Sequence, residues 1–413
     1  MAAEQRPLKI TIIGIHYAPE PSGNAPYTAG LAAGLSRRGH RVKVITGYPH
    51  YPWWKVAEGY GGWSMTEVLD GVRVKRVRHY VPRNPSTLRR ALMELGFGLR
   101  SVLTGWGRPD VVLLVTPALF ASRVAMLRAS LSRVPVVTWV QDIYTLGLVQ
   151  TGGDARQAAL VKRVESGLMS RSTRVVVIHD RFKAWLAAHL HLEVPLDVVR
   201  NWSHVASPGA FERDEVRALH GWSPTDVVVL HAGNMGVKQG LENVVATARL
   251  ASDSGSRVKL VLLGDGNQRQ QLEALDPSPR LQFIDPLPDG LFEQTMAAAD
   301  ILLVNELPGM TEMSVPSKLT SYYTTGLPVV AAVNSESTTA SEVSLAGAGV
   351  VVEPGDPAAL LRELEALAAD PELAVSLGAA GNEFRFSHLS EAAALDGFEQ
   401  ALSLAAQPQS SER

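Results

Sequence analysis

Residues 227–240, Val-Val-Val-Leu-His-Ala-Gly-Asn-Met-Gly-Val-Lys-Gln-Gly, decide the fold class of this chain. A β-branched apolar run ends at Gly233 and Gly236, Lys238 follows, and a helical pattern begins near Gly240. This order predicts a strand, a glycine turn and a helix. Glycines let the backbone approach a ligand closely, and a helix start beside a lysine attracts anions. The turn suits a phosphate, although a plain strand-to-helix turn explains the same residues about equally well.

A second lysine further along the chain extends this interpretation. Residues 315–319, Val-Pro-Ser-Lys-Leu, open another helical pattern, and both proline and serine are typical of a helix start. We disfavour the alternative that Lys318 is an ordinary solvated helix residue. The residues assigned to ligand binding on these grounds are Gly233, Asn234, Gly236, Lys238, Pro316, Ser317 and Lys318.

A third turn, Gly264-Asp265-Gly266, closes the apolar run Val258–Leu263. In a parallel sheet all three turns lie at the carboxyl edge, where ligands bind. Two lysine-bearing turns at one edge favour a site for a diphosphate. For Gly264 we favour a tight turn only, but it stays among the candidate binding residues.

The composition bounds the class of protein. A length of 413 residues predicts two or three domains, and 46% hydrophobic residues are enough for sizeable cores. The absence of cysteine excludes disulfides and thiolate metal sites, and it fits a reducing cytoplasm. No apolar run approaches ~18 residues, and the polar N-terminus does not resemble a signal peptide, so we expect neither a spanning helix nor secretion.

The net charge of −2 hides an uneven distribution. Residues 1–200 hold 27 Lys+Arg and 13 Asp+Glu, a balance of +14, whereas residues 201–413 hold 12 and 28, a balance of −16. The basic half should favour an anionic partner such as a membrane face or a phosphorylated acceptor. No helix-turn-helix, zinc finger or aromatic RNA-binding signature supports nucleic acid as that partner.

Both halves alternate short apolar runs with helical patterns, which is typical of parallel α/β sheets. The polar stretch 206–225 contains prolines and glycines, and we place a domain junction there. The expected strands are Ile10–Ile15, Val42–Thr46, Val72–Val77, Val111–Val115, Val136–Trp139, Val175–Ile178, Val227–Leu230, Val258–Leu263, Leu281–Ile284, Ile301–Val304, Val329–Ala332 and Val350–Val352.

The first strand-to-helix turn does not read Gly-x-Gly-x-x-Gly, so a nicotinamide or flavin dehydrogenase loses its main support. A long loop instead leads to Gly23, before a helical pattern over 27–38. This loop either covers a ligand, with Gly23 in contact, or is purely structural.

Several short motifs, spread over residues 17–319, resemble those of one enzyme family. They are Tyr17-Ala18-Pro19-Glu20, Pro49-x-Tyr51-Pro52, residues 80–85, Gln141-Asp142, Asn201-Trp202, residues 233–240 and residues 316–319. The chain is similar to the GT-B glycosyltransferases of glycosyltransferase family 4, above all to the fucosyl- and fucosamine-transferase-like branch of capsule, colanic acid and O-antigen assembly.

The resemblance implies an α/β fold of two Rossmann-like, doubly wound domains facing a cleft. Residues 1–205 would bind a lipid-linked or saccharide acceptor, and residues 206–390 a UDP- or GDP-linked sugar as donor substrate, with no further cofactor. Within 391–413, a helix over 391–404 would cross back to the first domain, followed by a tail. Transfer with retention of anomeric configuration is implied as well.

The chain departs from the family pattern at four positions. Asn234 replaces the usual arginine, Gln239 the usual lysine, Ser321 the glutamate that holds the ribose, and Gln141 a histidine. Glu306 and Glu312 are weak candidates for the ribose role.

Glycosyl transfer builds charge on the departing phosphate, and fixed cations and N–H dipoles stabilise such charge best. Lys238, Lys318 and the turn amides of residues 233–236 can supply both, and Asp142 can orient the acceptor or cap a helix. No Asp-x-Asp occurs and His189-x-His191 is a weak ligand set, so we predict no metal. A sugar-nucleotide epimerase and a non-catalytic sugar-nucleotide-binding protein remain as alternatives.

The segment 83–108 carries five arginines among apolar residues at 88, 92, 95, 99, 103 and 106. Their helical spacing predicts that part of this stripe is core. The arginines, with Phe97, could rest on anionic lipid. We therefore expect a cytoplasmic protein that is peripheral on the inner face of the plasma membrane, with a solvated face as the alternative.

Overall fold

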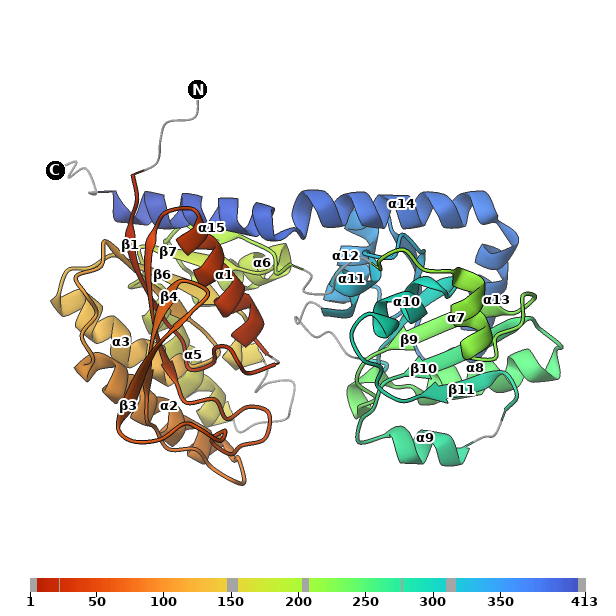
Figure 1. The fold of residues 1–413 in the computed structure, drawn as a ribbon, viewed down its shortest axis with the longest axis horizontal. Helices are drawn as coiled ribbons and strands as arrows, with labels where there is room; N and C mark the ends of the chain where they lie inside the picture. The colour runs from red at the N-terminus through yellow and green to blue at the C-terminus, as the bar shows by residue number, and fades with distance from the viewer. Residues whose placement is uncertain are drawn as a thin grey trace. The chain divides into compact units, whose positions relative to one another are not determined.

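A computed structural model describes residues 6–21, 23–146, 155–202, 208–275, 278–309 and 317–407. The chain forms two compact units, Met1–Asn201 with Glu391–Arg413, and Trp202–Ser390, here called the first and second domain. Each is an α/β domain with helices on a central sheet (Figure 1). The division falls a few residues before the expected boundary at 205/206, which lies outside the described residues.

The sheet of the first domain has the strand order β3-β4-β2-β1-β5-β6-β7-β8. Every neighbouring pair is parallel except β3 and β4. The strands are β1 (Lys9–Ile13), β2 (Arg41–Gly47), β3 (Ser64–Leu69), β4 (Val72–Val77), β5 (Val111–Val115), β6 (Val136–Val140), β7 (Arg174–Val177) and β8 (Leu196–Val198).

The sheet of the second domain has the order β11-β10-β9-β12-β13-β14 and is parallel throughout. This is the doubly wound order of a Rossmann fold, in which the direction of winding reverses between β9 and β12. The strands are β9 (Val227–Ala232), β10 (Val258–Leu263), β11 (Leu281–Ile284), β12 (Ile301–Asn305), β13 (Val329–Ala332) and β14 (Gly349–Val352). The predicted fold class is confirmed, whereas a cleft shared by both domains stays a prediction.

Helices lie between most strands. In the first domain they are α1 (Ala25–Arg37), α2 (Thr87–Leu103), α3 (Leu119–Leu131), α5 (Ala155–Met169), α6 (Asp180–Leu190) and α15 (Glu391–Ala406). In the second they are α7 (Arg213–Leu219), the 3₁₀ turn η1 (Val237–Gln239), α8 (Glu242–Asp253), α9 (Arg269–Leu275), α10 (Leu291–Ala297), α11 (Ser317–Tyr322), α12 (Thr338–Ala346), α13 (Pro357–Ala369) and α14 (Pro371–His388).

The last helix, α15, packs on the first domain. Phe398 lies edge-on to Trp139 of β6 with ring centroids 4.6 Å apart, and both side chains are fully buried. Glu399 accepts from His40 at 2.8 Å and pairs with Arg38 at 2.7 Å. The apolar contact and the ion pairs together tie the end of the chain to this domain.

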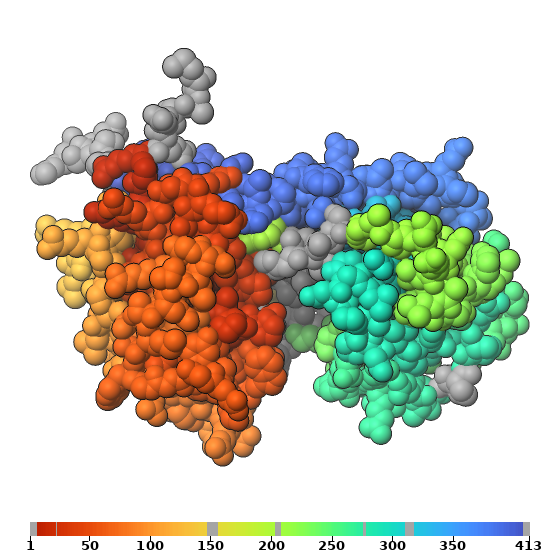
Figure 2. Space-filling view, in the orientation of Figure 1, coloured from red at the N-terminus to blue at the C-terminus, as the bar shows by residue number. Residues whose placement is uncertain are grey.

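The leucine stripe of α2, residues Leu88, Leu92, Leu95, Leu99 and Leu103, is exposed, and of the predicted apolar stripe only Trp106, which follows the helix, belongs to the core. Met93 and Phe97 on the opposite face fill the core instead, so the expected contact of Phe97 with lipid was wrong. Gly98 explains the choice of face, because a Cβ there would lie 2.9 Å from the Cα of Ala121 in α3. Helical spacing alone cannot tell which of two apolar faces meets the sheet. Residues of the first hundred positions form most of the visible face of this domain (Figure 2).

Candidate functional site

Lys318 lies directly over the glycine turn that follows β9. A Cβ on Gly233 would lie 2.9 Å from Cε of Lys318, and Gly233 has a φ of +127°, which only glycine adopts easily. Gly264, with a φ of +134°, lies so close to Gly233 that its Cβ would overlap the carbonyl oxygen of Gly233. The structure therefore places Gly233, Gly264 and Lys318 together at the carboxyl edge of the sheet.

The environment of Lys318 changes its protonation. Burial lowers the pKa of Lys318 to about 8, although the nearby Glu306 carboxylate acts in the opposite direction. His231 of β9 is fully buried. Its burial and, as a smaller cause, the charge of Lys318 keep the pKa of His231 well below the ordinary value. At neutral pH the turn thus presents a lysine cation beside a neutral histidine.

The main-chain amides of the turn already donate hydrogen bonds within the second domain. The N–H of Gly233 donates to the Leu263 carbonyl at 2.8 Å, and that of Met235 to the Asp265 carbonyl at 2.9 Å. The N–H of Gly236 donates to Oε1 of Gln239 at 3.0 Å. The packing of the two glycine turns and the Gln239 side chain use these three amides, so their contact with a phosphate stays a prediction that requires these hydrogen bonds to be exchanged.

Lys238 lies between the glycine turn and the helix that follows it, as the sequence predicts. It is exposed and lies in η1, whereas α8 begins only at Glu242. The Lys238 carbonyl accepts from the N–H of Leu307 at 2.9 Å. Asn305, at the end of β12, donates to the carbonyls of Gln239 and Gly240 at 2.8 and 2.9 Å. The turn that carries Lys238 is thereby fixed to β12.

The segments around Lys318 come from three elements. The hydroxyl of Tyr322 in α11 accepts from the N–H of Ala232 at 2.8 Å and donates to the Leu303 carbonyl at 3.2 Å, which ties α11 to β9 and β12. Glu306, a candidate for ribose binding, accepts from Oγ1 of Thr339 at 2.5 Å. Ser317 is the first residue of α11, while Pro316 and Glu312 lie outside the described residues.

Two motif residues of the first domain pair with each other. Gln141 follows β6, and its side-chain amide exchanges hydrogen bonds with that of Asn201 at 2.8 and 3.2 Å. The neighbouring Asp142 is exposed at the carboxyl end of β6. Gly23 has a φ of +67°, and the next residue, Asn24, donates to the Thr116 carbonyl at 3.0 Å, which anchors the loop after β1.

Sequence reasoning gave no role to the buried carboxylate of Glu20. One of its oxygens accepts from the main-chain N–H groups of His50 and Tyr51 at 2.7 and 2.9 Å, and the other pairs with Nδ1 of His16 at 2.7 Å. Burial would raise the pKa of Glu20, but the hydrogen bond and charge of His16, with those of His50, outweigh burial and lower it. The sequence feature that could have pointed to Glu20 is its place in the motif Tyr17-Ala18-Pro19-Glu20.

The same three side chains form a possible metal-ligand group. Ligand atoms of His16, Glu20 and His50 lie within 4.8 Å of one another. Both oxygens of Glu20 are already engaged by three donors, and Nδ1 of His50 lies 2.9 Å from the Tyr48 carbonyl. The hydrogen bonds account for the cluster as a loop anchor, so we assign no ion to it.

Known protein families match both halves of the chain. Residues 22–202 match the model described as a glycosyl transferase 4-like domain, and residues 226–370 match the model described as glycosyl transferases group 1. WcaI of Escherichia coli (strain K12), named as a colanic acid biosynthesis glycosyl transferase, is 31% identical over 347 residues, which are 77% of this chain and 82% of WcaI.

Solved structures share the fold. Sucrose-phosphate synthase from Thermosynechococcus elongatus has a TM-score of 0.72 at 19% identity, covering 97% of this chain and 100% of that one. Anabaena HepE, in complex with UDP, has a TM-score of 0.71 at 16% identity, covering 96% of this chain and 100% of that one.

Proposed function

The chain belongs to the glycosyltransferases that combine a 4-like domain with a group 1 domain, and from this premise we propose its reaction. The protein transfers a sugar from a UDP- or GDP-linked donor to a lipid-linked or saccharide acceptor in cell-surface polysaccharide synthesis. The name of WcaI supports this pathway class, and the UDP bound to HepE supports a nucleotide-sugar donor. The fucosyl branch remains a prediction.

The proposal rests on one observation. The Lys318 side chain lies against Gly233, at the carboxyl edge of the sheet where the two glycine turns meet. A diphosphate leaving group gains negative charge as the anomeric C–O bond breaks, and a preorganised cation in a partly dry site stabilises that charge. Lys318 performs this role, and the exposed Lys238 contributes a second charge from η1.

The remaining chemistry needs no dedicated base. In a retaining front-side reaction, the leaving phosphate oxygen takes the proton of the acceptor hydroxyl. Gln141 in place of histidine is compatible with this route, and Asp142 orients the acceptor. The proton transfer to the leaving phosphate and the role of Asp142 both rest on the proposed retention of configuration.

Labelled UDP- and GDP-sugars test the activity when they are incubated with the protein and a membrane extract that contains acceptors. Transfer to extractable lipid or polysaccharide, or slow release of nucleoside diphosphate, supports the proposal. Interconversion of the donor sugar would indicate an epimerase, and binding without turnover a non-catalytic protein. A thermal-shift series with UDP and GDP then identifies the base.

A chelator tests the proposed metal independence. Because Lys318 and Lys238 supply the positive charge, EDTA should leave the initial transfer rate unchanged. Complete loss that magnesium or manganese restores would contradict this proposal. The rate should be measured at the start of the reaction, where release of product does not limit it.

The proposed location is the inner face of the plasma membrane. No helix of the described residues is long and apolar enough to cross a membrane. The exposed leucine stripe of α2, with Arg89 and Arg90 on the same helix, has the amphipathic character of an interfacial helix. Anionic lipid would attract the basic first domain, whereas the negative charge of the second domain would be repelled.

A further inference from the structure

Glu94 is a buried carboxylate to which the proposed reaction gives no role. It lies on the core side of α2, beside Met93 and Phe97, and is only 4% exposed. Taking an ionised carboxylate out of water costs free energy unless hydrogen bonds replace the water. The hydrogen-bond partners of Glu94 therefore indicate what this side chain contributes to the domain.

Two donors from different segments satisfy Glu94. Its Oε1 accepts from the hydroxyl of Tyr144 at 2.7 Å, and its Oε2 accepts from the main-chain N–H of Phe120, near the start of α3, at 3.0 Å. Burial raises the pKa of Glu94, whereas these two hydrogen bonds act in the opposite direction. Hydrogen bonds to an ionised acceptor are roughly twice as strong as neutral ones, so the carboxylate holds the Tyr144 hydroxyl firmly.

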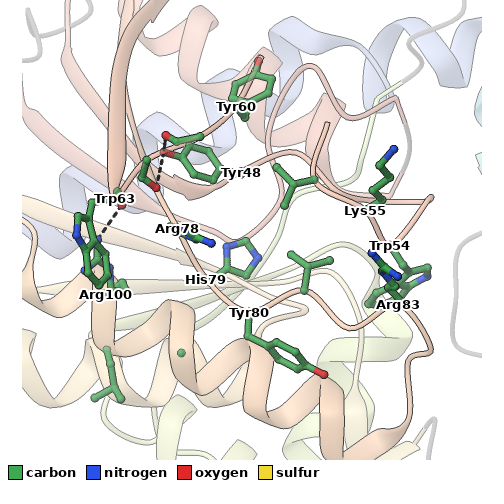
Figure 3. Close-up of a pocket in the computed structure, with 16 residues that line it drawn as sticks. Tyr48, Trp54, Lys55, Tyr60, Trp63, Arg78, His79, Tyr80, Arg83 and Arg100 are labelled. Carbon is green, nitrogen blue, oxygen red and sulfur yellow. Dashed lines mark hydrogen bonds between the residues drawn. The ribbon is translucent and has the colours of Figure 1, made fainter. Parts of the chain in front are cut away.

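The helix that carries Glu94 is fixed on more than one side. Gly98 lets α2 pack closely against α3. Another side of α2 borders a pocket of about 800 Å³. There Arg100 donates to the Trp63 carbonyl at 2.7 Å, and its guanidinium carbon lies 4.4 Å from the centroid of the Trp63 ring (Figure 3). Because these contacts hold α2, Glu94 offers Tyr144 an acceptor at a fixed place.

A second buried carboxylate holds the same loop from α5. Oε1 of Glu165 accepts from the N–H of Tyr144 at 2.8 Å, and Oε2 accepts from Oγ1 and the N–H of Thr145 at 2.6 and 3.3 Å. Burial raises the pKa of Glu165, and these hydrogen bonds act against that rise. Helix α2 thus anchors the side chain of Tyr144, while α5 anchors its main chain.

The anchored loop carries Asp142, the exposed residue to which the proposed reaction assigns the orientation of the acceptor. Asp142 lies near the Tyr144 hydroxyl, since its charge adds to burial and to Glu94 in raising the pKa of Tyr144 well above the ordinary value. On the other side of Asp142, the N–H of Gln141 donates to Oγ1 of Thr116 at 3.2 Å. Asp142 therefore lies between anchored residues, and its place follows theirs.

We propose that Glu94 is a positioning residue for the transfer reaction, because it sets the place of Asp142 through the Tyr144 hydroxyl. This inference rests on the proposed function, in which Asp142 orients the acceptor. A misplacement of about 1 Å can cost ~10²-fold in rate, so the loss of one charged hydrogen bond should be measurable.

A double-mutant cycle tests whether the effect passes through Asp142. Glu94→Gln and Tyr144→Phe should each lower kcat about tenfold and leave KM unchanged for the donor, which is assigned to the second domain. Neither change should slow a protein that already carries Asp142→Ala, because the position of a missing side chain cannot matter. Glu193→Gln, an exposed change between α6 and β8, is the matched control.

Hydrogen exchange measures the loop without using the reaction. In Glu94→Gln and Tyr144→Phe, the amides of residues 141–146 should exchange about tenfold faster than in wild type, and Glu193→Gln should match wild type. Tyr144→Phe removes only a hydroxyl, so it keeps the test decisive if Glu94→Gln does not fold.

Two results would overturn the role of Glu94. One is unchanged exchange over residues 141–146, and the other is a rate loss that multiplies with that of Asp142→Ala. Faster exchange in the variants of a protein whose wild type neither transfers sugar nor releases nucleoside diphosphate would uphold the anchoring by Glu94. That result would count against the proposed reaction alone.

Discussion

Lys318 and Gly233 depend on each other at the scale of single atoms. The lysine can cross the turn only because residue 233 has no side chain, and the same crossing buries the lysine enough to lower its pKa to about 8. A lysine with this pKa is protonated and positively charged at neutral pH, and it loses the proton and the charge in mild alkali. A reaction that needs this cation should therefore slow as the pH rises.

We expect kcat/KM for the donor to fall as the pH rises through about 8, because deprotonation of Lys318 removes the positive charge. In Lys318→Arg the guanidinium stays protonated, so the falling limb should move to higher pH even if the maximum rate is reduced. Steady-state rates from pH 6 to 10 for both proteins decide this. An identical alkaline limb in the two would assign the titration to another group.

The sequence predicted these residues with unequal success. Gly233, Gly264 and Lys318 meet as the parallel arrangement of three turns requires. The sequence could not predict which groups accept hydrogen bonds from the turn amides, nor that Lys238 lies in a 3₁₀ turn. Both features depend on contacts between β9, β10 and β12, which are far apart in the sequence.

At the scale of elements, the loop after β2 depends on one buried carboxylate. Glu20, from the loop after β1, accepts both main-chain N–H groups at the start of this loop. The fold lowers the pKa of Glu20, so the carboxylate stabilises the loop at neutral pH, and this stabilisation is lost as the pH falls through the lowered pKa.

Glu20→Gln should loosen the loop, because the charge that strengthens these hydrogen bonds is removed. The amides of His50 and Tyr51 should exchange about tenfold faster with solvent, as expected for weakening of a charged hydrogen bond. Hydrogen exchange followed by mass spectrometry over residues 48–60 measures this. Glu58→Gln, an exposed change in the same loop, should have no effect. Equal protection in the Glu20→Gln and wild-type proteins would show that other contacts hold the loop.

The strands show what periodicity can and cannot predict. All twelve expected strands are present, because buried parallel strands leave long apolar runs. β3 was missed since it is an edge strand with alternating exposure, although the Asp70-Gly71 turn that joins it to β4 is a known hairpin signal. β8 has only three residues and leaves too short a pattern.

For the whole molecule, the opposite charges of the two halves predict how it meets a surface. The first domain, residues 1–201 with 391–413, holds 28 Lys+Arg and 17 Asp+Glu, a balance of +11, and the second domain, residues 202–390, holds 11 and 24, a balance of −13. Anionic lipid would therefore attract the first domain and repel the second. The exposed leucines of α2 add an apolar contact that charge alone would not provide.

Co-sedimentation with anionic vesicles should show binding that weakens with salt. Arg89→Glu with Arg90→Glu should weaken it through charge, by ~1 kcal/mol for each basic residue near the bilayer. Leu92→Gln with Leu103→Gln should weaken it at all salt concentrations, because apolar burial is not screened. Leu219→Gln, an exposed leucine of the acidic second domain, is the control. Equal binding to neutral vesicles, or none to anionic ones, would leave the arginines of α2 as an ordinary solvated face.

The role of Lys318 is the central claim, and the transfer rate of Lys318→Ala beside Lys259→Ala tests it most directly. Lys259 is a partly buried lysine near the start of β10, in the same sheet but at the amino edge. We predict that Lys318→Ala lowers kcat by ~10²–10³-fold, a loss of ~2.7–4 kcal/mol of transition-state stabilisation, while Lys259→Ala keeps nearly full activity. Circular dichroism should show that both variants are folded. A folded Lys318→Ala protein with a rate within a few-fold of wild type would contradict the account.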